Sequence, residues 1–302
     1  MNERKSKIFC GVGTAMITPF KNGKIDYASL AGLIEWQIEC GVDALIIGGT
    51  TGEAATLTDS ERYELFRYTA EWINGRAKLI FGTGTNDTAL ALRHTQMAKE
   101  IGCDGALLVT PYYNKGTEEG IYRHYTTIAD SVDLPIILYN VPSRTGVNLG
   151  LNLLSRLSEH PNIVGLKEAG DSTDRLVALG ALGDSLPLYA GNDSQIFPTL
   201  FLGGVGVISV VSNLYPCTVK RICDSYFAGK VKVSRDLQFK ILPLVRALFA
   251  ETNPAPIKYA MAVKSLISPE VRLPLSEPRE STVKMLTDEI PAMDEIERTY
   301  KL

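Results

Sequence analysis

Residues 136–167 read IILYNVPSRTGVNLGLNLLSRLSEHPNIVGLK, and this stretch begins and ends with a short apolar run. Segments 136–139 and 164–167 are predicted strands, because short runs of Ile, Leu and Val bounded by Gly, Pro and Asn are typical of buried strands. The longer segment between them predicts a helix, so the stretch predicts parallel strands joined by a helical crossover. Further strands are predicted at residues 13–17, 44–47, 79–82, 106–109, 188–190 and 207–209.

Apolar residues between these strands recur three and four positions apart, as expected for amphipathic helices. Thr58 and Glu61 form a predicted capping box, and Thr117 is a predicted N-cap. Gly41 and Gly102 stand where a left-handed residue ends a helix. Two predicted helical faces consist of Tyr63, Phe66, Ala70 and Ile73, and of Leu90, His94, Met97, Ala98 and Ile101.

The strand–helix alternation occurs eight times by about residue 229. Eight units favour a closed (β/α)8 TIM barrel over an open doubly wound sheet, which usually has about five or six strands. We therefore expect the barrel at residues 1–229 and an all-helical C-terminal region at residues 230–302. A helical apolar stripe opens this second region, formed by Leu237, Ile241, Leu244, Val245 and Leu248.

The charge and hydropathy of the 302-residue chain favour a small-molecule partner. The 31 basic and 34 acidic side chains give a net charge of −3 without runs of one sign, so neither nucleic acid nor an anionic membrane is an expected partner. The N-terminal MNERKSKIF lacks the apolar stretch of a signal peptide, and no segment approaches about 18 uninterrupted apolar residues. These features predict a cytoplasmic location.

Cysteine and histidine spacing predicts neither a disulfide framework nor a metal site. The cysteines are odd in number and form no CxxC pair, so we expect them reduced and mostly buried. The histidines lie far apart, without HxxxH or HExxH spacing. The residues are Cys10, Cys40, Cys103, Cys217, Cys223, His94, His124 and His160.

Lys167 is the sharpest chemical signal in the chain. Active sites of α/β barrels lie at the C-terminal ends of the strands, and Lys167 ends an apolar strand there. Burial disfavours the ammonium form, and the neutral amine is a nucleophile. The alternative is an ordinary ion pair with Glu168, and position alone does not decide between the two.

Three other strand ends carry groups that suit an amine nucleophile. The phenol of Tyr139 could shuttle protons, although a tyrosine there could equally be a lid on the core. The glycine-flanked hydroxyls of Thr50 and Thr51 could hold a carboxylate, although an ordinary turn explains them too. Arg144 could bind a second carboxylate bidentately, or be a solvated surface residue. Together they suggest a reaction between a 2-oxo acid and another acid.

The motifs GGTTGEAATL, TPYYNKGTEEG, ILYNVPSRTG, IVGLKEA, AGNDS and GVISVVSN occur in this order. With the NPAP and RLPL segments near the C-terminus, the chain closely resembles the dihydrodipicolinate synthase family of pyruvate-dependent aldolases over essentially its whole length. The TTGE and PSRTG versions favour the synthase over N-acetylneuraminate lyase. The resemblance implies condensation of pyruvate with L-aspartate 4-semialdehyde, a step of lysine and diaminopimelate biosynthesis, without metal or organic cofactor.

The same resemblance implies the residue roles. Lys167 forms a Schiff base with pyruvate, Tyr139 relays protons, and Thr50 orders a hydroxyl relay with Tyr139 and Tyr113. It also implies a homotetramer built from two dimers, in which Tyr113 enters the site of the neighbouring subunit. The expected substrate-binding residues are Thr51 for the pyruvate carboxylate, Arg144 for the aldehyde substrate, and Gly191 and Ile208 through main-chain contacts.

One departure from the family pattern bears on regulation. Lysine-inhibited members carry histidines after the TTGE loop and a glutamate early in the third barrel helix, where this chain has Asp59, Arg62 and Leu90. We therefore expect weak or absent inhibition by lysine. Two other functions stay open: a sister lyase, of the N-acetylneuraminate lyase or 2-keto-3-deoxy sugar acid aldolase type, that differs near Arg144, and a non-catalytic pyruvate sensor.

Overall fold

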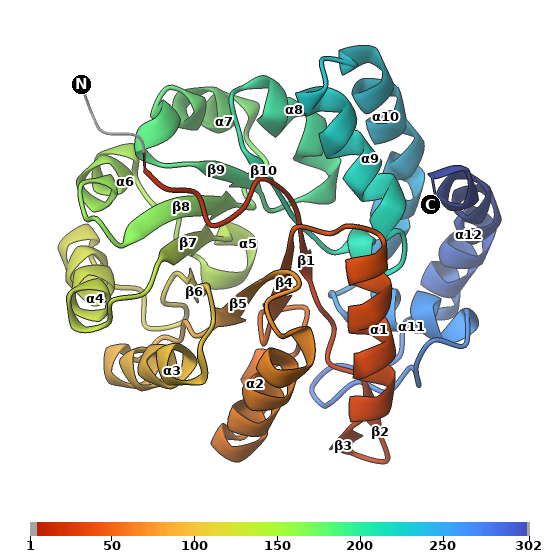
Figure 1. The fold of residues 1–302 in the computed structure, drawn as a ribbon, viewed down its shortest axis with the longest axis horizontal. Helices are drawn as coiled ribbons and strands as arrows, with labels where there is room; N and C mark the ends of the chain where they lie inside the picture. The colour runs from red at the N-terminus through yellow and green to blue at the C-terminus, as the bar shows by residue number, and fades with distance from the viewer. Residues whose placement is uncertain (1–4, 301–302) are drawn as a thin grey trace.

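The computed structural model describes residues 5–300, and within them eight parallel strands close into a barrel (Figure 1). The strand order around the barrel is β1-β10-β9-β8-β7-β6-β5-β4, so the first and last strands pair and leave no open edge. The fold prediction is confirmed. The barrel strands are β1 Gly11–Ala15, β4 Ala44–Ile47, β5 Lys78–Gly82, β6 Gly105–Val109, β7 Ile136–Asn140, β8 Ile163–Glu168, β9 Leu188–Ala190 and β10 Gly206–Ser209.

Helices surround the barrel on its outside (Figure 1). The capping box of Thr58 and Glu61 opens α2, and Thr117 caps α4, both as predicted. The outer α-helices are α1 Tyr27–Glu39, α2 Asp59–Ile73, α3 Thr88–Ile101, α4 Glu118–Ser131, α6 Leu151–Ser158, α7 Thr173–Gly180, α8 Ile196–Phe201 and α9 Pro216–Phe227, whereas the short α5 Pro142–Thr145 follows β7 at the barrel mouth. Short 3-10 turns are η1 Ala54–Thr56, η2 Gly183–Ser185, η3 Asp193–Gln195 and η4 Val211–Asn213.

The predicted strands match the observed ones closely except at the N-terminus. Strand β1 begins and ends two residues earlier than predicted, because its pairing with β4 stops at Ala15 opposite Ile46. The amide of Met16 still donates to the carbonyl of Ile46, whereas that of Ile17 leaves the ladder and donates to Oδ1 of Asn213. A short antiparallel pair, β2 Phe20–Lys21 with β3 Lys24–Ile25, follows and was not predicted.

The predicted buried face of α2 was wrong at one position. Tyr63 is 45% exposed, whereas Arg62 and Leu65 beside it are buried together with Phe66 and Ile73. The buried stripe therefore includes an arginine that a hydrophobicity pattern does not select, because its guanidinium donates to the carbonyls of Ala54 and Gly82. In α3 the face is shifted similarly, and its buried residues are Ala91, His94, Thr95 and Ala98.

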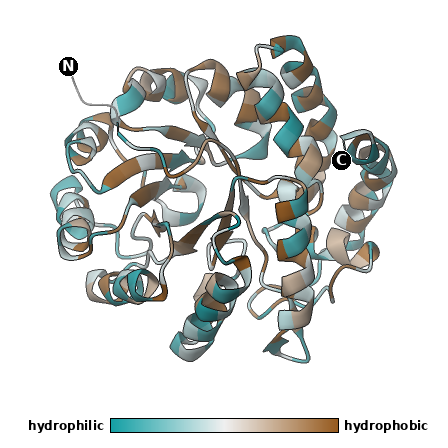
Figure 2. Ribbon diagram, in the orientation of Figure 1, coloured by the Kyte–Doolittle hydropathy of each residue, from teal (hydrophilic) through white to brown (hydrophobic). Residues whose placement is uncertain are grey.

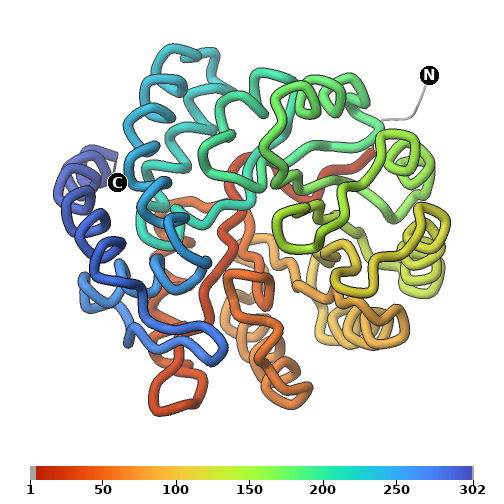
Figure 3. Tube along the Cα trace, turned by 180° about the vertical axis from the view of Figure 1, so that it is seen from behind, coloured from red at the N-terminus to blue at the C-terminus, as the bar shows by residue number. Residues whose placement is uncertain are grey.

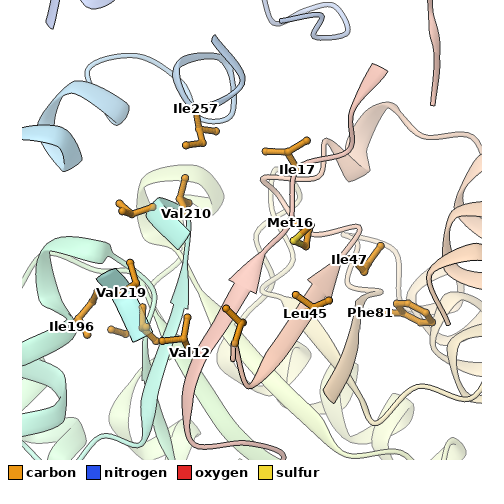
Figure 4. Packing of buried hydrophobic residues seen from close by; sticks show 14 of the residues in the cluster. Val12, Met16, Ile17, Leu45, Ile47, Phe81, Ile196, Val210, Val219 and Ile257 are labelled. Carbon is orange, nitrogen blue, oxygen red and sulfur yellow. The ribbon is translucent and has the colours of Figure 1, made fainter. Parts of the chain in front are cut away.

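Two apolar layers fill the barrel and its surroundings. Alternate strand residues point inward and outward, so one set packs inside the barrel and the other packs against the helices. Figure 2 shows hydrophobic colouring along the strands and mixed colouring on the helices. Figure 4 shows part of the outer layer, from Ile196 and Val219 to Phe81. The inner layer includes Ile46, Ile80, Ile137, Tyr139, Tyr189 and Ile208.

The C-terminal helices pack against the barrel. They are α10 Val231–Leu248, α11 Ala255–Val263 and α12 Glu280–Tyr300, and seen from behind in Figure 3 they lie beside the first and last parts of the barrel. The predicted stripe of α10, from Leu237 to Leu248, is buried. Because α10 and α12 both contact α9, the helices share one core with the barrel. The boundary at residue 229 stays a prediction.

The prediction of reduced cysteines was wrong for one pair. Cys40 and Cys217 form a disulfide with their Cα atoms 5.2 Å apart. Barrel closure through β1 and β10 brings the end of α1 next to the start of α9, and sequence spacing does not reveal a contact across 177 residues. Glu297 lies beside both sulfurs and accepts a hydrogen bond from the amide of Cys217 at 2.9 Å.

Among the described residues, no helix combines the length and apolar character needed to cross a membrane.

Candidate active site

A cavity of about 480 Å³ opens at the C-terminal ends of β7, β8 and β9. In the pairing of β7 with β8, Tyr139 lies directly opposite Lys167. Six of the residues predicted for the site line this cavity, and the other two do not. The six are Thr50, Thr51, Tyr139, Arg144, Lys167 and Gly191.

Lys167 is 5% exposed and lies beside an aromatic ring. Its Nζ is 4.2 Å from the centroid of the Tyr139 ring. Within residues 5–300, no carboxylate forms an ion pair with this amine. A buried lysine that is not held in an ion pair is a candidate nucleophile, and the buried Asp193 carboxylate interacts with it through electrostatics alone.

The pleat of β8 separates Lys167 from Glu168. Successive side chains of a strand point to opposite faces, so Lys167 faces the barrel interior and Glu168 the helix layer. There the Glu168 carboxylate accepts hydrogen bonds from Nε of Arg175 at 3.0 Å, from Nδ2 of Asn140 at 2.9 Å and from the amide of Gly170 at 2.7 Å. The alternative of an ion pair between Lys167 and Glu168 is therefore wrong.

Tyr139 and Thr50 both line the cavity, but they are not hydrogen-bonded to one another in the described chain. Tyr139 is buried and Thr50 is partly exposed. Tyr113 is 89% exposed, has a φ of 70° and lies outside the cavity of its own chain. The predicted hydroxyl relay is thus not assembled within the single chain.

The TTGE loop forms a compact turn after β4. Gly48 has a φ of +66°, which glycine adopts without strain, and Gly52 donates its amide to the carbonyl of Gly49 at 3.1 Å. Thr51 is buried, and its Oγ1 accepts a hydrogen bond from Nδ2 of Asn253 at 3.0 Å. The loop presents Thr50 and Thr51 to the cavity.

Arg144 lies on α5 at the cavity mouth. Its Nη2 donates to the carbonyl oxygen of Asn253 at 3.0 Å, which restrains the side chain although the residue is exposed. The guanidinium has five N–H donors in total, so others remain for a bound carboxylate. Arg144 is therefore not simply a solvated surface arginine.

Gly191 directly follows β9 in a tightly packed position, and Ile208 lies in β10. The amide of Gly191 donates to the carbonyl of Glu168 at 2.6 Å, and a Cβ at Gly191 would lie 2.6 Å from that oxygen, so only glycine fits. Ile208 is fully buried in the inner layer and does not line the cavity.

Among the lining residues to which the sequence assigned no role, two are polar and buried, Asn253 and Asp193. Asp193 is buried, and its carboxylate accepts hydrogen bonds from Oγ of Ser209 at 2.5 Å and from the amide of Val210 at 2.9 Å. Burial raises the pKa of Asp193. Both residues belong to motifs quoted above, AGNDS and NPAP, but only the fold shows that they reach the site.

A second cavity of about 350 Å³ adjoins the first and shares Thr50, Tyr139, Arg144 and Asn253 with it. Arg62 lines this cavity. Asp59 and Leu90, the other two positions at which the chain departs from lysine-inhibited members, do not line it. A carboxylate oxygen of Asp59 lies 3.2 Å from Nε2 of His94. The two cavities are therefore adjacent compartments around Thr50 and Arg144.

The model of the dihydrodipicolinate synthetase family matches residues 8–293 of the chain. The chain belongs to the dihydrodipicolinate synthetase family. Among curated relatives, a 4-hydroxy-tetrahydrodipicolinate synthase of Clostridium novyi (strain NT) is 46% identical over 280 residues, which cover 92% of this chain and 95% of the relative.

Solved structures of dihydrodipicolinate synthases have the same fold. The 4-hydroxy-tetrahydrodipicolinate synthase of Methylacidiphilum fumariolicum SolV is 44% identical, with a TM-score of 0.92 and coverage of 95% of this chain and 96% of that one. The chloride-inhibited dihydrodipicolinate synthase of Acinetobacter baumannii, complexed with pyruvate, is 40% identical, with a TM-score of 0.92 and coverage of 95% and 99%.

Proposed function

We propose that the protein condenses pyruvate with L-aspartate 4-semialdehyde to give 4-hydroxy-tetrahydrodipicolinate, a step of lysine and diaminopimelate biosynthesis. The observation that carries this proposal is the buried amine of Lys167, which lines a cavity with two hydroxyls, a phenol and an arginine and has no ion-pair partner among the described residues. Membership of the family supports the choice of substrates.

In the proposed mechanism, the Nζ of Lys167 attacks C2 of pyruvate, and loss of water gives an imine. Loss of a proton from C3 gives an enamine, whose C3 adds to the aldehyde carbon of the second substrate. The amino group of that substrate then attacks the imine carbon, which closes the ring and releases Lys167. Tyr139 is the proposed proton relay, because its ring lies against the Lys167 amine.

Each substrate carboxylate has a proposed binding group. Thr51 and the loop amides around it bind the carboxylate of pyruvate, and Arg144 binds the carboxylate of the aldehyde. Gly191 and Ile208 contribute main-chain contacts near Lys167. The positions of Thr51, Arg144 and Gly191 around one cavity support this assignment of binding groups to the two substrates.

The proposed assembly is a homotetramer of two dimers, acting in the cytoplasm, in which Tyr113 completes the relay of Thr50 and Tyr139 in the neighbouring subunit. Its support is the exposure of apolar surface near the second cavity: Tyr113 is 89% and Leu273 83% exposed, and their neighbours Tyr112 and Pro274 line that cavity. Among the described residues these two are the most exposed of the large apolar side chains, and contiguous exposed apolar surface is typical of protein interfaces.

We propose that lysine inhibits this enzyme weakly or not at all. Arg62 places a buried guanidinium beside the second cavity, and Leu90 provides no carboxylate to pair with the amino groups of lysine. A lysine titration at saturating substrates should leave the rate nearly unchanged up to millimolar concentration. Strong inhibition in that range would contradict this proposal.

The proposed function is tested by mixing the protein with pyruvate and L-aspartate 4-semialdehyde and coupling product formation to NADPH consumption by dihydrodipicolinate reductase. Rapid turnover that requires both substrates is the expected result. If a folded protein gives none but borohydride still traps pyruvate on Lys167, a sister lyase replaces the proposal. If borohydride traps nothing, the protein is a non-catalytic relative.

A further inference from the structure

We propose that Asn253 is a positioning residue that fixes Thr51 and Arg144 relative to one another. These two residues are the proposed binding groups for the two substrate carboxylates. This inference rests on the proposed function, because it assigns a role to Asn253 in binding the same two substrates. It goes further by giving a substrate-positioning role to a residue of the C-terminal region, which also lines the cavity with Val245, Arg246 and Phe249.

The contacts of Asn253 carry the proposal. The residue is 5% exposed and lines both cavities. Its side-chain Nδ2 donates to Oγ1 of Thr51 at 3.0 Å, and its main-chain oxygen accepts from Nη2 of Arg144 at 3.0 Å. One buried residue thus contacts both proposed carboxylate-binding groups.

The direction of the Thr51 hydrogen bond has a chemical consequence. A threonine hydroxyl has one proton to donate and lone pairs to accept. When Oγ1 of Thr51 accepts from Nδ2 of Asn253, its own proton remains to be donated to the pyruvate carboxylate. The amide therefore orients the hydroxyl as a donor, which is the polarity that an anionic ligand needs.

A buried ion pair anchors the same segment to the TTGE loop. Lys258, in the first turn of α11, pairs with Glu53 at 2.5 Å between Nζ and Oε1, and both side chains are almost fully buried. The second carboxylate oxygen of Glu53 accepts from the amide of Arg272 at 2.9 Å. Glu53 has a φ of 54°, a left-handed conformation uncommon for residues other than glycine, and these contacts hold it there.

Asn253 and the Lys258–Glu53 ion pair have different roles in holding the TTGE loop. The ion pair fixes the backbone of the loop two residues after Thr51, and Asn253 fixes the hydroxyl of Thr51 itself. A loss at Asn253 should therefore weaken substrate binding without disturbing Lys167, which lies on β8.

The test uses the full-length variants Asn253→Ala and Asn253→Asp, with KM for each substrate, kcat, borohydride trapping of pyruvate and the thermal midpoint as measurements. We expect Asn253→Ala to raise KM for pyruvate about tenfold and KM for the aldehyde about threefold, since the main-chain contact to Arg144 survives. Trapping at saturating pyruvate should remain complete.

Asn253→Asp separates positioning from packing. The variant keeps the size and shape of the side chain but replaces the Nδ2 donor with a carboxylate oxygen, so the hydroxyl of Thr51 would turn toward it and a negative charge would face pyruvate. We expect KM for pyruvate to rise at least as much as in Asn253→Ala. A purely structural role predicts near-parental KM values in this near-isosteric variant.

Lys264→Met is the matched control. Lys264 also belongs to the C-terminal region and pairs with Asp294, away from the loop, so its KM values should stay within about twofold of the parent. If the KM values of Asn253→Asp also stay within about twofold of the parent, and borohydride still traps pyruvate on Lys167 in that variant, the proposal is overturned. If the parent itself neither traps pyruvate nor turns over, the proposed function fails and this inference fails with it.

Discussion

Among residues 5–300, two lysines are buried at the C-terminal side of the barrel, and their surroundings differ in one decisive respect. Lys258 is 0% exposed and its Nζ lies 2.5 Å from a carboxylate oxygen of Glu53. Lys167 is similarly buried, yet its amine faces the Tyr139 ring and a cavity. A buried lysine that is paired serves the fold, whereas one left unpaired beside a cavity is available for chemistry.

Whether each lysine is paired depends on the direction in which the nearest glutamate side chain points. Glu53 has a left-handed backbone conformation, and its carboxylate forms an ion pair with Lys258 of α11. Glu168 follows Lys167 directly, but the pleat sends it to the other side of β8, where it pairs with Arg175. Adjacent opposite charges in a strand are thus poor predictors of an ion pair.

Removing the unpaired amine should produce the largest effect on activity. Lys167→Ala deletes the nucleophile and should lower kcat/KM by at least roughly 10³-fold, because no other described group in the cavity offers an amine for the same covalent step. The thermal midpoint should change little, since no ion pair is broken. Turnover near the parental rate would show that Lys167 is not the nucleophile.

Replacing the proton relay should give the next largest effect on rate. Tyr139→Phe keeps the ring against Lys167 but removes the hydroxyl, and loss of a general acid–base group typically costs roughly 10²–10⁴-fold in rate. Stopped-flow or single-turnover kinetics should show slow imine formation. An unchanged kcat would mean that Tyr139 only lines the core.

Removing the paired amine should affect stability. Lys258→Met leaves the buried carboxylate of Glu53 without its cation, which typically costs about 3–5 kcal/mol in the free energy of unfolding. The double variant Glu53→Met/Lys258→Met removes both charges and should recover most of that loss in urea unfolding. Equal instability of the single and double variants would contradict this explanation.

His124 is a buried base that forms no ion pair with a carboxylate among the described residues, and its titration should have the smallest effect. Its Nδ1 lies 2.9 Å from Oγ1 of Thr88, and burial lowers the pKa of His124 to about 4. A depressed folded-state pKa means that the folded protein gains stability above the unfolded-state pKa of about 6.5 and loses it as the pH falls toward 4. We expect a loss of roughly 1–3 kcal/mol over this range.

Urea unfolding at several pH values checks the His124 prediction. The parent should lose stability between pH 6.5 and 4, and His124→Gln should show a shallower loss, because the group that takes up a proton on unfolding is gone. Parallel curves for the two proteins would assign the pH dependence to other groups.

Local patterns predicted the fold because each barrel strand is a short apolar run followed by polar residues. The motifs placed Lys167, Tyr139, Thr50, Thr51, Arg144 and Gly191 around one cavity, since strand ends of a parallel barrel meet at the same face. Contacts between distant segments could not be predicted in this way. The pairings of Cys40 with Cys217, Glu53 with Lys258 and Thr51 with Asn253 each span more than 170 residues.

Reductive trapping tests the central difference between the two lysines most directly. The protein is incubated with pyruvate, reduced with borohydride, digested and mapped by mass spectrometry, with Lys167→Ala as the control. We predict one reduced pyruvyl adduct, on the peptide that contains Lys167, and no adduct in the control. An unmodified Lys167, or an adduct on Lys258 instead, would contradict the assignment of Lys167 as the nucleophile.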